Sequence, residues 1–146
     1  MKAKVLNEGP ERTIALVFDR ADEPLTLMRR FVAEHAVSAA RISGIGAFER
    51  AVVGYFDWQR KDYRRIDVPG QVEVLSMLGD VALDGGTPAV HLHVVLGRAD
   101  GSTVGGHLLE ASVRPTLEVV LVESPAWLRK RHDPESGLAL IDLGGG

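Results

Sequence analysis

The chain of 146 residues contains no cysteine. It can therefore form no disulfide, and it offers no thiolate as a nucleophile or a metal ligand. It also has no run near the roughly 18 consecutive apolar residues of a membrane-spanning helix, and its first residues hold too short an apolar segment for a secretory signal. These absences predict a protein of a reducing compartment, the cytoplasm, with no membrane partner.

An excess of positive charge is missing as well. The formal net charge is −3 and the pI is about 5.9, which disfavours a strong general affinity for nucleic acid, because such binding usually depends on a basic face. Hydrophobic residues make up 45% of the chain, and a domain of this length buries roughly 70% of its unfolded surface. We expect one domain over residues 1–146, with a short disordered glycine tail at 144–146, that needs no metal to fold.

Most of the chain shows the β-branched, aliphatic composition of short strands. Such strands are expected at residues 12–18, 39–45, 47–56, 72–83, 89–96, 104–111, 117–123 and 138–143. One long amphipathic helix should begin near Asp22, as its cap, and Pro24, in its first turn. Leu25, Met28 and Val32 then fall at helical spacing and indicate the buried side of this helix.

The links between these elements are short. We expect a charged connection at 60–65, turns at 68–70, 84–86 and 100–101, and a helical turn at 127–132. Short serial links favour antiparallel pairing, because a parallel crossover takes a dozen or more residues. The predicted fold is therefore of the α+β class: a twisted, largely antiparallel sheet packed with one main helix.

Two common enzyme signatures are not present. The glycine-rich segment 43–47 lacks the Lys-Ser/Thr of a P-loop and does not follow the Gly-x-Gly-x-x-Gly pattern, so a tight bend is favoured over nucleotide binding. Ser43, Ser76 and Ser102 lack a Gly-x-Ser-x-Gly elbow. A serine hydrolase is therefore not expected.

Three of the five histidines stand close together in the sequence. Because residues two apart in a strand share a face, the side chains of His91 and His93 should project together. The segment after Arg98 fits a three-residue hairpin loop, which would pair Arg98 with Ser102 and set His93 opposite His107. The three imidazoles are therefore expected to converge.

Converging imidazoles suit a divalent transition metal. Zinc is favoured, with iron, copper or nickel as alternatives, and a catalytic zinc commonly has three protein ligands and a water. Glu118 or Glu73 could orient a ligand or act as a base. The other interpretation is that His91, His93 and His107 line a polar sheet face or a subunit contact without any metal. His35 and His132 are expected in solvent.

A His-x-His on a strand is also typical of cupins, which carry a glutamate a few residues later and a further histidine. In this chain the nearest carboxylate after His93 is Asp100, in the predicted turn. The cupin pattern therefore fails at a ligand position, and we do not expect a cupin.

Two basic clusters could touch phosphates. The first has Arg60, Lys61, Arg64 and Arg65 with interleaved aromatic residues, and the second is the segment 129–132 beside Trp127. Aromatic residues among basic ones can stack bases in single-strand binders, but the same pattern occurs in ordinary solvated loops that an aromatic side chain anchors to the core. Of the two clusters, the first is our candidate nucleic-acid contact.

With these features placed, the chain resembles the plants and prokaryotes conserved (PPC) domain family, whose members occur alone in prokaryotes and beside AT-hooks in plant nuclear proteins. The most diagnostic segments are His91-Leu92-His93-Val94-Val95-Leu96-Gly97 and Gly105-Gly106-His107-Leu108. Further matching segments lie at 34–35, 42–47, 54–56, 73–79, 100–101 and 118–121.

The resemblance implies a largely antiparallel α/β fold, a homotrimer, and a DNA-binding or regulatory role. The chain departs from the plant members because it has no Arg-Gly-Arg-Pro core of an AT-hook. We therefore expect a stand-alone PPC-like protein that forms a homotrimer, binds a metal through His91, His93 and His107, and has a DNA-binding or regulatory function. The alternative is an uncharacterised metalloenzyme that acts on a small molecule through the same histidines.

Overall fold

The fold is known from a computed structural model that describes residues 1–7, 9, 11–124 and 128–144. Within these residues the chain forms one helix and nine strands. In chain order they are β1 (Lys2–Asn7), β2 (Thr13–Phe18), α1 (Pro24–Glu34), β3 (Ala40–Asp57), β4 (Asp62–Val68), β5 (Val72–Asp84), β6 (Thr87–Gly97), β7 (Thr103–Glu123), β8 (Arg129–His132) and β9 (Ala139–Ile141). The predicted α+β class, mostly strand with one helix, is confirmed.

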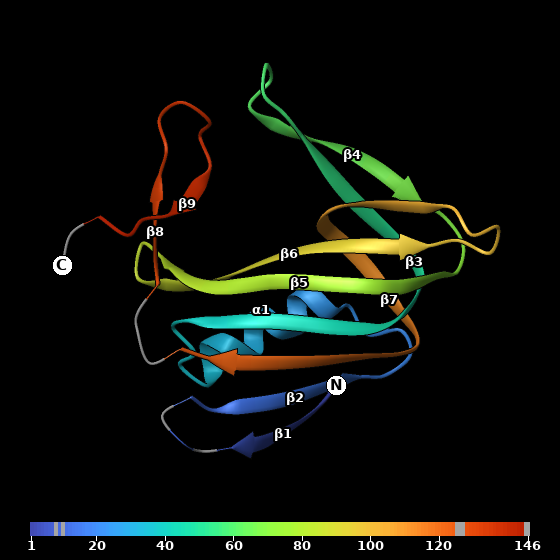
Figure 1. The fold of residues 1–146 in the computed structure, drawn as a ribbon, viewed down its shortest axis with the longest axis horizontal. Helices are drawn as coiled ribbons and strands as arrows, with labels where there is room; N and C mark the ends of the chain where they lie inside the picture. The colour runs from blue at the N-terminus through green and yellow to red at the C-terminus, as the bar shows by residue number, and fades with distance from the viewer. Residues whose placement is uncertain (8, 10, 125–127, 145–146) are drawn as a thin grey trace.

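All nine strands belong to one sheet, and α1 lies behind it in Figure 1. The main path runs β1-β2-β7-β3-β5-β8-β9, while β4 pairs with β3, and β6 pairs with both β5 and β7. The pairs are antiparallel except β5 with β8, which is parallel. The long strands β3 and β7 continue from the main sheet into the part of the fold that carries β4 (Figure 1). Because β6 pairs with both β5 and β7, and each of these two strands also pairs with β3, the sheet is strongly curved.

The helix covers only one face of the sheet. Its N-cap is Glu23, whose carboxylate accepts hydrogen bonds from the backbone of Leu25 and Thr26. The predicted cap, Asp22, instead accepts a hydrogen bond of 2.7 Å from the amino group of Met1. The buried side of α1 packs into the core with the alternate residues of the strands: Leu25, Met28, Phe31, Val32, Met77, Leu92, Val94, Leu108 and Leu121.

The opposite face of the sheet keeps large apolar side chains in solvent. We call this the open face, and its exposed residues are Ile45, Leu75, Leu78, Val95 and Val120. A hollow of about 490 Å³ lies over it and is lined by four of these side chains together with parts of β2 and β7. Monomeric proteins seldom expose so continuous an apolar surface without using it.

Several expected element boundaries are wrong. The two strands expected at 39–45 and 47–56 are one strand, β3, and those at 104–111 and 117–123 are one strand, β7. Both run through register shifts that bend them without ending the pairing. The segment 60–65 is largely β4 rather than a loop, and 129–132 is β8 rather than a helical turn. Trp127 lies outside the described residues.

The predicted hairpin after β6 is confirmed. Arg98 donates its backbone N–H to Ser102, Gly101 has a φ of 82°, and His93 lies directly opposite His107. No described helix is both long and apolar enough to cross a membrane. The cytoplasmic location and the single domain over 1–146 stay predictions from the sequence.

Candidate metal centre

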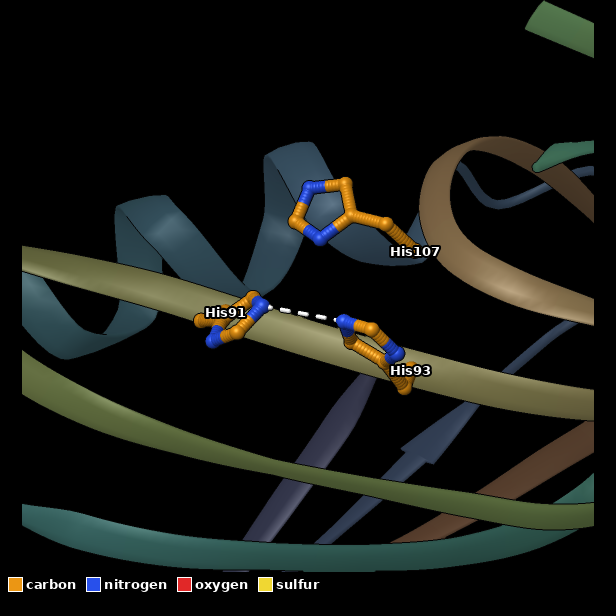
Figure 2. Close-up of side chains that lie close together, drawn as sticks. All are labelled: His91, His93 and His107. Atoms are coloured by element: carbon orange, nitrogen blue, oxygen red, sulfur yellow. Dashed lines mark hydrogen bonds between the residues drawn. The ribbon is translucent and has the colours of Figure 1, made fainter. Parts of the chain in front are cut away.

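Three histidines from two adjacent strands meet beside β6. His91 and His93 lie on β6, and His107 comes from β7, on the far side of the hairpin. In Figure 2 one ring nitrogen of each residue is turned toward the other two. The nearest pair, Nε2 of His91 and Nε2 of His93, is 3.2 Å apart, and one nitrogen from each of the three rings lies within 4.8 Å of the others. The predicted convergence is therefore present.

Glycines allow His107 to come this close. A Cβ on Gly105 would lie 2.6 Å from the carbonyl oxygen of Val94 on β6, and one on Gly106 would lie 2.6 Å from that of Gly54 on β3. Neither position has room for a side chain, so β7 packs against β6 and β3 at backbone contact. Gly105 and Gly106 thus set how closely β7, and with it His107, approaches β6.

A carboxylate orients His91. Asp80 lies opposite it on β5, and its Oδ2 is 3.3 Å from Nδ1 of His91. If Nδ1 carries the proton, it donates a hydrogen bond to this oxygen. The Nε2 atom then keeps its lone pair and faces His93 (Figure 2). Such carboxylate–histidine pairs are the usual support of metal-binding imidazoles.

The other oxygen of Asp80 belongs to an ion pair. The Nζ of Lys130, on β8, lies 3.3 Å from Oδ1, as a charge contact rather than an aligned hydrogen bond. Burial opposes ionisation of Asp80, but the hydrogen bond from His91 and the charge of Lys130 hold its pKa below the usual value. The carboxylate is therefore charged at neutral pH.

His107 is held by stacking rather than by hydrogen bonds. The ring of Tyr63, on β4, lies against it with the centroids 4.6 Å apart and the planes 21° from parallel. Its Nδ1 is buried and has no hydrogen-bond partner among the described residues. A buried polar atom without a partner costs free energy, and this nitrogen faces His91 and His93 (Figure 2).

The electrostatics of the cluster favour neutral imidazole rings at His93 and His107. Burial, together with the nearby positive charges of His91, His93, Arg29 and Lys130, lowers the pKa of His107 to about 4. Burial and the charge of His91 also lower the pKa of His93, against a smaller opposing effect of Asp80. Neutral imidazole is the form that binds a metal, so these side chains are ready to act as ligands at neutral pH.

The spacing of His91 and His93 fits two ligands of a tetrahedral metal. Two nitrogens that are each about 2.0–2.1 Å from a zinc ion lie roughly 3.4 Å apart at a tetrahedral angle, close to the 3.2 Å between His91 and His93. The third nitrogen, on His107, lies within 4.8 Å of the other two, so its ring would have to move inward to reach the same ion. His93 is exposed, which leaves a side of the cluster open to solvent for a fourth ligand.

The remaining candidate ligands and bases lie elsewhere. Glu73 is opposite Gly97, and Glu118 is opposite Ile45, so neither joins the histidine cluster. His35 stacks on Phe31 at the end of α1, and His132 lies 3.8 Å from Asp84.

The candidate nucleic-acid residues lie on the β3–β4 hairpin. Arg60 is 4.0 Å from Asp57, and Arg65 pairs with Glu110. The guanidinium of Arg64 lies over Tyr55 at 5.5 Å, while Lys61 occupies the turn with a φ of 52°. Two of the four positive charges are therefore offset by carboxylates.

Comparison with known proteins agrees with the fold. The profile of the Plants and Prokaryotes Conserved (PCC) domain matches residues 6–125. The chain belongs to this family. The PPC protein of Pyrococcus horikoshii is 34% identical, with a TM-score of 0.84 over 90% of this chain and 91% of that one.

Two further PPC-like structures carry functional names. A metal-containing protein of Archaeoglobus fulgidus is 32% identical, with a TM-score of 0.81 over 96% of both chains. A protein of Ralstonia eutropha JMP134, named as a candidate DNA-binding protein, is 26% identical, with a TM-score of 0.80 over 89% of this chain and 90% of that one.

A curated relative shows the domain within a longer protein. Residues of this chain are 31% identical to part of the bifunctional protein GlmU of a Synechococcus strain, over 113 residues that make up 75% of this chain. The chain spans only 17% of the length of that relative, so the likeness concerns this PPC region alone.

Proposed function

We propose that this PPC protein binds a divalent transition metal, with zinc favoured, through His91, His93 and His107. The observation that carries the proposal is the buried Nδ1 of His107, which has no hydrogen-bond partner among the described residues and faces the two other imidazoles (Figure 2). A metal would satisfy this atom. The metal-containing relative from Archaeoglobus fulgidus supports the assignment.

The side chains around the cluster have separate tasks. Asp80 would favour the tautomer of His91 with the proton on Nδ1, and Tyr63 supports the ring of His107 by stacking on it. The three histidines would hold zinc as neutral ligands, and the bound ion would supply Lewis acidity toward a small molecule that reached the solvent side of the cluster at His93. This is the basis of the alternative function, a metalloenzyme acting on a small molecule.

Metal content tests the proposal directly. Untagged protein purified without chelators should contain about one metal per chain by elemental mass spectrometry, and the His91→Ala, His93→Ala double variant should contain almost none. His132→Ala is the matched control, because it removes a histidine outside the cluster. Wild-type protein that stays metal-free after incubation with zinc, or a double variant that binds as well, would disprove the site.

We also propose that the protein is a homotrimer whose contacts cover the open face. Burying apolar surface contributes about 25 cal/mol per Å², and Ile45 and Leu78 are each about 60% exposed in the single chain. Leu78→Lys would place a charge in this contact and should reduce the mass measured by light scattering. A wild-type mass of one chain at micromolar concentration would refute the trimer.

DNA binding through Arg60, Lys61, Arg64 and Arg65 is the second candidate function. It is supported by the candidate DNA-binding relative from Ralstonia eutropha and by the place of all four residues on one hairpin. In a trimer the hairpin would be present three times, which raises the effective concentration of the contacts. Replacing Arg64 and Arg65 with alanine should flatten the salt dependence of binding to duplex DNA. If wild-type protein does not shift DNA at low salt, this function is excluded.

A further inference from the structure

The hairpin of β8 and β9 follows the part of the chain that the family profile matches. The match ends at residue 125, and β8 begins at Arg129. β8 pairs in parallel with the end of β5, where Asp84 is opposite Lys130, and Leu83 donates its backbone N–H to Leu128 at 2.8 Å. This hairpin is therefore fixed to the strand that carries Asp80.

Lys130 is buried in a way that lysines seldom are. Only 8% of its side chain is exposed, and its Nζ lies 3.3 Å from Oδ1 of Asp80. A buried ammonium group is costly unless a counter-charge compensates it. Asp80 supplies that charge, and its other oxygen faces Nδ1 of His91. One carboxylate thus connects the hairpin to the histidine cluster.

We propose that Lys130 is a positioning residue of the metal centre: it fixes the Asp80 carboxylate so that Oδ2 accepts a hydrogen bond from the Nδ1–H of His91, leaving Nε2 of His91 free for the metal. The inference rests on the proposed metal-binding function of the three histidines. Lys130 lies beyond the residues that the family profile matches, whereas His91, the ligand that it would orient, lies within them.

Lys130 has two opposing effects on a bound cation. Its positive charge repels the metal, and the negative charge of Asp80, 3.3 Å away, opposes that repulsion. No other cation can replace Lys130 in orienting the Asp80 carboxylate, because no other cation is paired with Asp80 among the described residues. Partners of this kind typically change metal affinity about 10–100-fold. The positioning effect should therefore prevail, and loss of Lys130 should weaken binding.

The test is a metal-affinity cycle at one fixed pH, with zinc competed against a chromophoric chelator. Lys130→Met should bind zinc about 10-fold more weakly than wild type, and Lys130→Arg, which keeps the charge, should recover most of the loss. The double variant with Asp80→Asn should bind no more weakly than Asp80→Asn alone, because both changes remove one interaction. Arg131→Met is the control on the same strand, since Arg131 is exposed and pairs with Asp142. Equal or tighter binding by Lys130→Met overturns the inference.

A second measurement separates this inference from the function it rests on. In metal-free protein, the ¹⁵N chemical shifts of His91 report which ring nitrogen carries the proton. Wild type and Arg131→Met should hold the proton on Nδ1, and Lys130→Met should lose that preference. If neither wild type nor any variant binds zinc, but the tautomer of His91 changes in Lys130→Met, the proposed metal function is wrong and the positioning role of Lys130 stands. If the tautomer is the same in all variants, the positioning role is wrong.

Discussion

Replacing Gly79 with alanine should disturb the metal centre without touching any histidine. Gly79 lies on β5 opposite Leu92, between the positions of Asp80 and Leu78 that face His91 and His93. A Cβ built on it would lie 2.1 Å from the carbonyl oxygen of His91 and 2.7 Å from Cδ2 of Leu92. The first of these atoms belongs to the backbone, so rotation of a side chain cannot relieve the clash.

The size of the effect follows from these distances. A carbon normally approaches a carbonyl oxygen no closer than about 3.3 Å, so β6 must move by roughly 1 Å at His91. Overpacking of this kind costs about 1–3 kcal/mol, and at roughly 2–4 °C per kcal/mol the melting temperature should fall by about 2–12 °C. Metal ligands tolerate deviations of only about 0.2 Å, so zinc affinity should fall by about 10-fold or more.

Gly97→Ala provides the control for this experiment. Gly97 lies on the same pair of strands, opposite Glu73, but the three atoms nearest to its added Cβ all belong to the side chain of Leu75, at 3.1–3.3 Å. Melting should be followed by circular dichroism at one protein concentration, and zinc affinity at 25 °C, where both variants are folded. If Gly79→Ala melts and binds zinc like wild type, β5 and β6 do not approach as closely as described.

Three other outcomes are expected. In chelator-treated protein, folding lowers the pKa of His107 to about 4, from an ordinary value near 6.5. Between these two pH values the unfolded state binds more protons than the folded state, so the urea midpoint of wild type should fall as the pH drops from about 6.5 to 4. The midpoint of His107→Gln should fall less. Glu23→Ala removes the helix cap and should cost about 1 kcal/mol in urea denaturation, unlike Glu34→Ala. Tyr63→Leu, but not Tyr63→Phe, should weaken zinc binding in chelator competition, because the ring that stacks on His107 is lost.

The meeting of the histidines could be predicted from the sequence because it depends on local rules. Strand alternation places His91 beside His93, and the loop at Gly101 fixes the register that brings His107 opposite. Asp80 could have been found in the same way. The turn at Gly85 and Gly86 pairs Asp84 with Thr87, and counting back along both strands sets Asp80 opposite His91.

Other features depend on contacts that no local rule provides. Lys130 reaches Asp80 through a parallel pairing between distant segments, and its sequence neighbours indicate only a basic, solvated stretch. The continuity of β3 and β7 was missed because bulges and glycines resemble strand ends in sequence, while in the sheet they only shift the register. The charged residues at 62–65 are likewise typical of a loop in sequence, but they form part of β4. A strand of an antiparallel sheet can keep one polar face in solvent.

The position of Leu78 has a consequence for the kinetics of metal exchange. Leu78 belongs to the open face and lies directly opposite His93, the most exposed of the three histidines. A second chain that covers Leu78 would also approach the solvent side of the cluster. Metal would then enter and leave mainly through separated chains, whose fraction falls as the protein concentration rises. The residence time of the metal would therefore rise with protein concentration even where its affinity did not.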